Sequence, residues 1–363
     1  MGNLIVIVTG TDPQSRRGGI AFALPGYFAA MESVEIRWEF IATHHATERW
    51  GKWWWWMRAV PRLWRLVRMA QRQEERVVVY GHAGPGISLA RQGSMLALGR
   101  LMGAKTVMQL HAIKFDHYLR SFWQRWLFKL ALSGACGIAV LTPWWRERLL
   151  EGGVNKAIYV VPNPLPKVWE DKASLEQESY GKRSDGEINV LAISRVEAGK
   201  GVELLLLAMT YLTDNVRLVI AGDGRLLSTL RRRAESLGLG GRVEFSGWVD
   251  GNEKQRLIDR ADLFCLPTSY DSFGMGFLEA MANGLPVVAL NWGPIRDVVP
   301  HGRAGILVDN PQPKVVADGI RQLMDVEVRR RMGAEGRRWV LDRFSASRVG
   351  VELRRMLEDL TAE

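Results

Sequence analysis

The sequence predicts an α/β protein made of two doubly wound parallel-sheet domains that face each other across a central cleft. Three observations support this fold class. The length of 363 residues is enough for two domains. Short apolar runs alternate with helical stretches along most of the chain, as in βαβ units. The segment from Leu263 to Leu290 reads as strand, glycine loop, helix and strand, which is one complete parallel unit.

The first half contains six apolar runs that we predict to be strands of one parallel sheet. They are Leu4–Val8, Val34–Phe40, Val77–Tyr80, Thr106–His111, Gly137–Leu141 and Ile158–Val161. These runs place an N-terminal domain at residues 1–168. A polar stretch follows, so residues 169–186 are predicted to be a linker.

The second half predicts a similar sheet over residues 187–340. Its strands are expected at Ile188–Ile193, Val216–Ala221, Val243–Phe245 and Leu263–Leu266, with a further strand opened by Pro286. A helix is expected at Met275–Ala282, because Asn283-Gly284 supplies the left-handed stop that ends many helices.

Two carboxylates flank the corner between the glycine loop and this helix. Asp271 lies in the loop, and Glu279 lies about one turn inside the helix. Backbone NH groups at a helix start attract an anion, whereas a carboxylate accepts hydrogen bonds from ribose or sugar hydroxyls. Phosphate, ribose and sugar in one pocket describe a nucleotide-sugar. The alternative is that Glu279 is a carboxylate favoured by the helix dipole and that Asp271 is a turn residue.

The segment around these carboxylates resembles the Glu-x7-Glu motif of retaining GT-B glycosyltransferases, family 4 (glycosyl transferases group 1). The match includes Phe273-Gly274, Glu279-Ala280-Met281-Ala282 and Pro286-Val287-Val288, and it departs where Asp271 replaces the usual first glutamate. The resemblance implies two Rossmann-like domains, with residues 341–363 forming a helix that packs back on the N-terminal domain. It also implies hexosyl transfer from a nucleoside diphosphate sugar to a hydroxyl.

A second matching motif is Arg195-x4-Lys200-Gly201, between a strand end and a helix start. Fixed cations there can stabilise the charge that develops on a departing diphosphate without a metal. The alternative is a solvated basic turn. The resemblance implies that Arg195 and Lys200 hold the diphosphate, while Glu279 binds the ribose and Asp271 binds the sugar.

Further donor-binding residues are implied by the same resemblance. Gly18-Gly19 resembles a family loop that faces donor and acceptor, and His111 stands where the family commonly has a histidine near the donor sugar. His111 is expected to hydrogen-bond a hexose hydroxyl and not to act as a general base. The remaining predicted donor-binding residues are Gly222, Trp248, Val249, Phe273, Gly274 and Met275. A packing role for the glycines and a structural role for the histidine stay open.

Other classes of nucleotide enzyme are disfavoured by missing motifs. No Gly-x-Gly-x-x-Gly follows the first strand, and there is no Gly-x4-Gly-Lys-Ser/Thr loop. The chain has no Asp-x-Asp, and its six histidines and two cysteines form no ligand cluster in the sequence. We therefore expect no metal and no cofactor, since the nucleoside diphosphate sugar is a substrate. Cys136 and Cys265 read as buried thiols in a reducing compartment.

The net charge of +10 is unevenly distributed. Residues 1–172 hold 23 Lys/Arg against 12 Asp/Glu, whereas the rest hold 26 against 27. Within the basic half, residues 49–76 combine the consecutive tryptophans Trp53–Trp56 with arginines at helical spacing: Arg58, Arg62, Arg65, Arg68 or Arg72, and Arg76. A basic amphipathic helix with tryptophans is typical of a membrane interface. The alternative is an ordinary sheet-covering helix with a solvated arginine face.

These features predict a retaining, metal-independent glycosyltransferase that acts on a lipid-linked or glycan acceptor in cell-surface polysaccharide or glycolipid synthesis. We expect the protein in the cytoplasm, because we find no signal peptide and no apolar run of about 18–20 residues, the length that a membrane-spanning helix needs. There it is expected to be peripheral, bound to an anionic membrane surface through residues 49–76. No nucleic-acid partner is expected. Two other functions remain open. A nucleotide-sugar epimerase of the same fold would convert donor with no acceptor. A non-catalytic basic adaptor for membrane or nucleic acid would leave Arg195, Lys200 and Glu279 unexplained.

Overall fold

The computed structural model describes residues 3–15, 18–45, 52–174 and 186–362. The chain forms two compact units, called here the first and the second unit. The first unit combines Met1–Lys167 with Phe344–Glu363, and the second unit is Val168–Arg343. The predicted linker differs, because its first six residues, 169–174, lie in helix α7 (Lys167–Ser174) and belong to the second unit. Residues 175–185 lie outside the described part.

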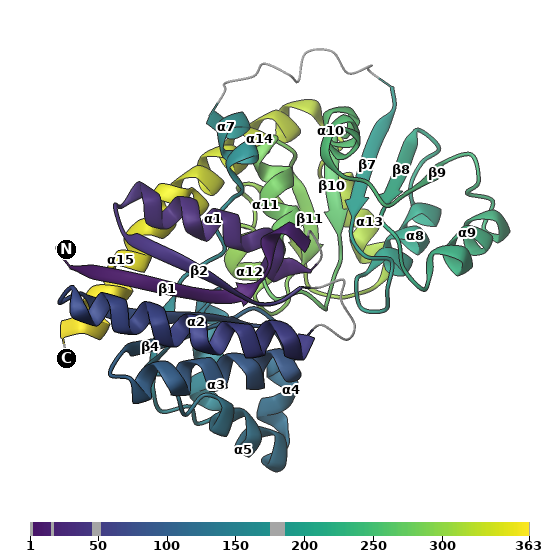
Figure 1. The fold of residues 1–363 in the computed structure, drawn as a ribbon. Coiled ribbons are helices and arrows are strands. Elements are labelled where there is room, and N and C mark those ends of the chain that lie inside the picture. Colours follow the sequence, from purple (N-terminus) through teal and green to yellow (C-terminus); the bar gives the residue numbers. More distant parts are fainter. Residues whose placement is uncertain (1–2, 16–17, 46–51, 175–185, 363) are drawn as a thin grey trace. The chain divides into compact units, whose positions relative to one another are not determined.

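The first unit contains a parallel six-stranded sheet of order β2-β1-β3-β4-β5-β6 (Figure 1). Its strands are β1 (Leu4–Thr11), β2 (Arg37–His44), β3 (Arg76–Ala83), β4 (Lys105–Leu110), β5 (Gly137–Val140) and β6 (Ala157–Val160). All six predicted strands are present. The strand predicted from Val34 starts at Arg37 instead, because the backbone NH groups of Val34 and Ile36 donate to the Met31 carbonyl and close the preceding helix.

Helices cover both faces of this sheet (Figure 1). The helices α1 (Gly19–Ser33) and α15 (Ala346–Ala362) pack on one face, against the side chains of Leu4, Val6 and Val8. The other face carries α2 (Lys52–Arg72) and α3 (Ile87–Leu101), and α5 (Phe122–Ala131) packs against α3. Two shorter helices, α4 (Phe115–Arg120) and α6 (Pro143–Glu151), complete the unit.

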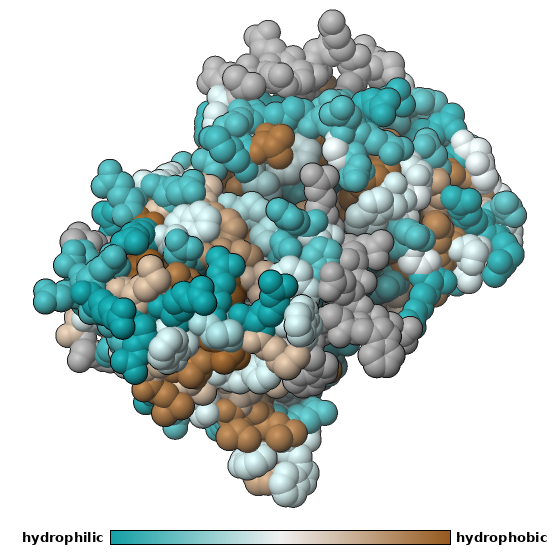
Figure 2. Space-filling model, in the orientation of Figure 1, coloured by the Kyte–Doolittle hydropathy of each residue, from teal (hydrophilic) through white to brown (hydrophobic). Residues whose placement is uncertain are grey.

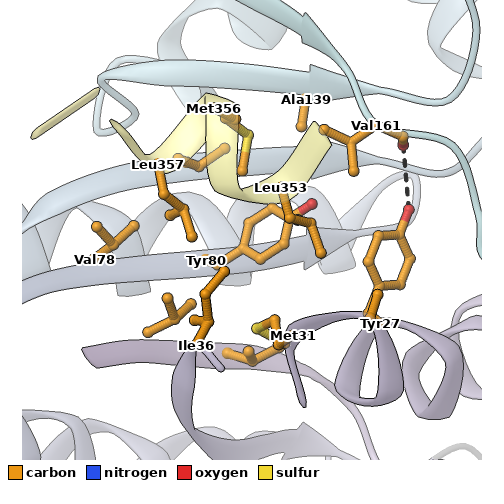
Figure 3. Packing of buried hydrophobic residues seen from close by; sticks show 14 of the residues in the cluster. Tyr27, Met31, Ile36, Val78, Tyr80, Ala139, Val161, Leu353, Met356 and Leu357 are labelled. Carbon is orange, nitrogen blue, oxygen red and sulfur yellow. Dashed lines mark hydrogen bonds between the residues drawn. The ribbon is translucent and has the colours of Figure 1, made fainter. Parts of the chain in front are cut away.

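Helix α15 closes the core of the first unit (Figure 3). Its residues Leu353, Met356 and Leu357 are fully buried and point toward Val78 and Tyr80 of β3. These three positions share one helix face at intervals of three and four residues, as an amphipathic helix requires. The chain's last helix is therefore a structural part of the first unit.

The second unit contains a parallel six-stranded sheet of order β12-β11-β10-β7-β8-β9. Its strands are β7 (Ile188–Ile193), β8 (Val216–Ala221), β9 (Val243–Gly247), β10 (Leu263–Leu266), β11 (Val287–Leu290) and β12 (Gly305–Val308). The sequence did not predict β12, which is a four-residue edge strand. Besides α7, its helices are α8 (Val202–Ala208), α9 (Leu227–Ser236), α10 (Gly251–Arg260), α11 (Met275–Ala282), α12 (Ile295–Val298), α13 (Pro313–Arg321) and α14 (Val326–Phe344).

Both sheets belong to the doubly wound class that the sequence predicts. In each unit the chain leaves its first strand toward one side of the sheet and later returns to the other side. None of the described helices combines the length and the apolar character needed to cross a bilayer.

Candidate functional site

The carboxyl ends of the strands in the second unit form one edge, called here the carboxyl edge. From β7 the chain proceeds to β8 and β9 on one side, while β10 pairs with β7 on its other side. The sheet therefore changes direction between β7 and β10. Loops that leave such a pair of strands diverge, and ligands of open α/β sheets bind at this switch point.

Backbone contacts hold the two loops of the switch point together. The Gly199 carbonyl accepts hydrogen bonds from the backbone NH of Ser269 at 3.0 Å and from the Thr268 hydroxyl at 3.1 Å. Gly201 has a φ of +78°, and a Cβ there would lie only 2.0 Å from the Pro267 carbonyl oxygen. Only glycine fits this approach, which brings the start of α8 against the end of β10.

Lys200 and Asp271 meet across the switch point. The Nζ atom of Lys200 lies 2.8 Å from Oδ2 of Asp271, and their side chains are 12% and 22% exposed. The other oxygen, Oδ1, accepts a hydrogen bond of 3.1 Å from the backbone NH of Gly274. Asp271 thereby joins the β7–α8 loop to the start of α11, where the backbone NH groups point along the helix axis.

The start of α11 is shaped by backbone. Gly274 precedes the first helical residue, Met275, and has a φ of +89°. The side chain of Phe273 is buried in the core. Of the predicted sugar-binding stretch Phe273–Met275, Phe273 and Gly274 are buried, and the Gly274 NH already donates to Asp271, whereas Met275 is partly exposed.

Glu279 lies one turn into α11 and pairs with a lysine that the sequence analysis did not select. Lys254 of α10 donates to Oε2 of Glu279, and the two side chains are 20% and 14% exposed. The Lys254 ammonium also lies 5.7 Å from the ring centroid of Trp169. A carboxylate has about four lone-pair positions, so Glu279 keeps acceptor capacity for a diol beside Lys254.

Arg195 differs from Lys200 in its surroundings. Its side chain is 58% exposed and lies 2.9 Å from Glu197 on the same loop. The structure therefore brings Lys200, Asp271 and Gly274 together, while Arg195 and Glu279 each have a different ionic partner.

The loops after β8 and β9 adjoin the same edge. The backbone NH of Gly222 donates to the Gly247 carbonyl at 2.6 Å, and Val196 NH donates to the Asp223 carbonyl at 2.9 Å. Gly222 has a φ of +145°, and a Cβ there would overlap the Ser194 carbonyl oxygen at 1.8 Å. Beyond Gly247, the side chain of Trp248 is exposed and that of Val249 is buried.

Three predicted residues lie in the first unit. Gly18 is the N-cap of α1 with a φ of +87°. In the described part of the chain, a Cβ on Gly18 or Gly19 would meet no atom within 4 Å, so close packing does not require glycine at either position. Their backbone is accessible at the carboxyl edge of the first sheet.

His111 follows β4 and is paired with a second histidine. Its Nε2 lies 2.9 Å from Nδ1 of His82 at the end of β3, and the rings stack at 5.1 Å between centroids. Burial lowers the pKa of His111 to about 3, and burial with the neighbouring His111 lowers the pKa of His82 well below its usual value. Both rings are therefore neutral near pH 7, with one nitrogen donating and the other accepting.

Among the described residues, no three His, Cys, Asp or Glu side chains are placed to hold a metal ion. The second unit instead offers a half-buried ammonium, two carboxylates and the amides that begin α11. Such a set can bind a polyhydroxylated anion, because the cation and amides match phosphate and the carboxylates match hydroxyls.

Comparison with known proteins agrees with this geometry. Residues 175–339 match the family described as glycosyl transferases group 1. The second unit belongs to that family. An uncharacterized glycosyltransferase of Methanocaldococcus jannaschii is 32% identical over 204 residues, which are 54% of this chain and 52% of that protein. A GDP-mannose-dependent phosphatidylinositol monomannoside mannosyltransferase of Mycobacterium tuberculosis is 35% identical over 162 residues, or 42% of each chain.

The matched region thus spans about half the length of the curated relatives. Solved structures extend the likeness of fold to the whole chain. Anabaena HepE in complex with UDP and glucose has a TM-score of 0.70 and 18% identity over 97% of this chain and 99% of its own. Sucrose-phosphate synthase of Thermosynechococcus elongatus has a TM-score of 0.72 and 17% identity over 99% of each chain. The fold is GT-B.

Two residues that contact predicted site residues were not predicted from the sequence: Lys254 in the second unit and His82 in the first unit. Lys254 lies in a helix of ordinary charged composition, 25 residues before its partner. His82 is 29 residues before His111. The signal that points to His82 is its position: it ends an apolar run next to the strand that precedes His111, and neighbouring parallel strands end at the same edge.

Proposed function

We propose that this protein is a retaining, metal-independent glycosyltransferase that moves a hexosyl residue from a nucleoside diphosphate sugar to a hydroxyl of a lipid-linked acceptor. The observation that carries the proposal is the Lys200–Asp271 pair at the switch point, tied to the first turn of α11. The group 1 family match and relatives named for hexosyl transfer support the reaction class. A neighbour that binds UDP and glucose supports the donor class.

Each predicted residue has a role in this proposal. Lys200 and the exposed Arg195 bind the diphosphate, and Glu279 binds the ribose. Asp271 and the backbone of Phe273, Gly274 and Met275 bind the sugar. The loops at Gly222 and Trp248-Val249 contact the nucleobase of the donor. Gly18-Gly19 contacts the sugar or the phosphate, and His111 hydrogen-bonds a hydroxyl of the hexose.

The proposed chemistry needs no enzymic nucleophile. The bond between the anomeric carbon and the phosphate oxygen breaks, and the acceptor oxygen bonds to the same face of that carbon. The acceptor proton passes to a phosphate oxygen of the departing diphosphate. Lys200 stabilises the charge that remains, because an ammonium held in a half-buried position is less screened than one in water.

Nucleotide binding provides the first test. Thermal unfolding is measured with UDP, GDP and ADP, and one of them should stabilise the wild type by about 2.7 kcal/mol at about 100 times its dissociation constant. Lys200→Ala and Glu279→Ala should lose most of this shift while staying folded. Lys314→Ala and Glu235→Ala, exposed on α13 and α9, are the matched controls. A wild-type shift in both site variants would contradict the assignment.

The donor and its product provide the second test. With the matching nucleotide-sugar and an acceptor, the product should keep the anomeric configuration of the donor, and turnover should persist in excess EDTA. Incubation without acceptor should leave the donor sugar unchanged. An epimerised donor would support the epimerase instead, and loss of turnover in EDTA would contradict metal independence.

The lipid-linked acceptor is proposed from the surface of α2. Ala59, Leu63 and Val67 are buried on one face, while the solvent face exposes the side chains of Trp54, Met57, Arg58, Arg62, Trp64, Arg65, Arg68 and Arg72. Arg58 lies 5.9 Å from the Trp54 ring centroid and Arg68 lies 5.7 Å from that of Trp64. Cations stacked on exposed tryptophans suit the phosphate level of an anionic bilayer. The side chain of Trp53 lies outside the described part.

A further inference from the structure

Helix α5 exposes most of its apolar residues to solvent. Phe128 is its one buried residue. The side chains that remain exposed are Phe122 (69%), Trp123 (71%), Trp126 (54%), Leu127 (57%) and Leu130 (55%). A contiguous apolar surface of this kind marks a contact with a partner or a membrane.

A groove runs between α5 and α3. It has a volume of about 590 Å³, within the range of about 300–1,000 Å³ of ligand sites. Its lining consists mainly of small and aliphatic side chains: Gly86, Leu89, Ala90, Gly93, Ser94, Ala97, Tyr118, Gln124, Leu127, Leu130, Ala131 and Ser133. The α3 members, from Leu89 to Ala97, recur at intervals of three and four, so they follow one helix face for about 12 Å.

The groove starts at the carboxyl edge of the first sheet. Gly86, its first lining residue, comes three residues after Ala83, the last residue of β3. The Ala83 carbonyl accepts a hydrogen bond of 3.1 Å from the backbone NH of His111. A chain lying in the groove would therefore end close to His111, which has the proposed hydroxyl contact.

Positive charge borders this apolar surface. Arg125 and Lys129 follow each other at four-residue spacing on α5, beside the exposed aromatic residues. Neither forms an ion pair with another described residue. The first unit as a whole holds 25 Lys/Arg against 14 Asp/Glu. Figure 2 shows apolar side chains gathered along the margin where Figure 1 places α3 and α5.

Tryptophans, unpaired cations and an apolar groove fit a lipid better than a protein partner. Aromatic rings and basic groups concentrate at the membrane–water boundary, and an apolar groove that follows a helix face suits a hydrocarbon chain. We infer that the α3–α5 groove binds the hydrocarbon chain of the acceptor lipid, while α5 lies in the surface of an anionic bilayer. This inference rests on the proposed function, because that function supplies the acceptor.

The groove is tested with a single-chain probe, 11-(dansylamino)undecanoic acid, followed by its fluorescence. The wild type should bind it saturably. Ala90→Phe fills the groove from an exposed position on α3 and should weaken binding by at least about tenfold. Ala97→Met, two turns further along α3, should also weaken it. Thr229→Phe, which adds an equal ring to an exposed position of α9, should bind as the wild type does.

The bilayer contact is tested by co-sedimentation with vesicles of phosphatidylcholine containing one quarter phosphatidylglycerol. Trp123→Ser with Trp126→Ser should reduce vesicle binding by about tenfold or more, whereas Ala90→Phe should retain it. Brominated acyl chains should quench less fluorescence in the double variant than in the wild type. Unchanged vesicle binding in the double variant, or a dimer of the wild type that this variant dissociates without losing vesicle binding, would overturn the inference.

Nucleotide stabilisation of the same variants separates the two proposals. The UDP, GDP or ADP shift arises in the second unit and should persist in Ala90→Phe and in Trp123→Ser with Trp126→Ser. A wild type that binds probe and vesicles but no nucleotide would overturn the proposed function alone. A wild type that binds nucleotide normally and no probe would overturn the groove alone.

Discussion

His111 cannot serve as a cation at neutral pH, because burial lowers its pKa to about 3. The hydrogen bond between Nε2 of His111 and Nδ1 of His82 also couples the tautomers of the two rings. Whichever of these nitrogens carries the proton donates it, and the other must accept. The tautomer of His111 therefore depends on that of His82. This arrangement suits a neutral hydrogen-bonding role and is consistent with the expectation that His111 is not a general base.

The same pair predicts a pH dependence of stability. Between about pH 6.5 and pH 3 the unfolded histidines bind protons that the folded ones do not, so the free energy of unfolding should decrease as the pH falls. Urea unfolding from pH 7 to pH 4 should show a shallower decrease for His82→Gln with His111→Gln than for the wild type. Equal slopes would show that the pair is not the source.

A second prediction at the scale of single residues concerns the effect of Gly222→Ala on stability. The Gly222 φ of +145° and the overlap of an added Cβ with the Ser194 carbonyl make Gly222→Ala costly, by at least about 1–3 kcal/mol from backbone strain. Chemical denaturation measures this loss. Gly240→Ala is the control, since a Cβ there meets open space among the described residues, and it should change stability little.

At the scale of elements, the segment from β10 to β11 was predicted most closely. The helix at Met275–Ala282 matches the expected bounds, because a glycine loop and Asn283-Gly284 define both of its ends locally. The strand β12 was missed because it begins with Gly305, a residue type that strands disfavour, and this leaves an apolar run of only Ile306–Val308. Helix α7 was missed because its few buried residues, Trp169 and Ala173, are set in a charged sequence.

The candidate site was predictable to the same extent. Lys200 and Asp271 were chosen from separate motifs 71 residues apart, and the topology brings them into contact. Lys254 could not be selected in this way, since its significance depends on a contact between α10 and α11 that no local pattern specifies. His82 could be found only from its place at the end of the strand next to the one that precedes His111.

Helix α15 offers a test of packing. Leu353→Ala removes a fully buried side chain from the first unit's core and should lower the free energy of unfolding by about 2–5 kcal/mol. Val351→Ala, on the exposed face of the same helix, should change it by no more than about 0.5 kcal/mol. Denaturant midpoints compare the two variants, and similar losses would contradict the packing assignment.

At the scale of the whole molecule, the charge is divided between the units. The first unit has a net charge of +11 and the second of −1. Electrostatic attraction to anionic vesicles should therefore weaken as salt shortens the Debye length from about 10 Å at 0.1 M to about 3 Å at 1 M. Arg62→Glu, Arg65→Glu and Arg68→Glu together should weaken binding further. Arg231→Glu, Arg232→Glu and Arg256→Glu in the second unit are the control, and equal loss in both sets would contradict a surface specific to α2.

The discontinuity of the first unit has a consequence during biosynthesis. Because α15 completes that core, the ribosome must translate all of the second unit before residues 346–362 can reach Leu4, Val78 and Tyr80. The second unit is continuous and can fold as soon as it emerges, since domains fold as units during synthesis. Nascent chains arrested before Ala346 should thus resist protease in the second unit while the first remains susceptible, and chaperones should bind the earlier-made half longer.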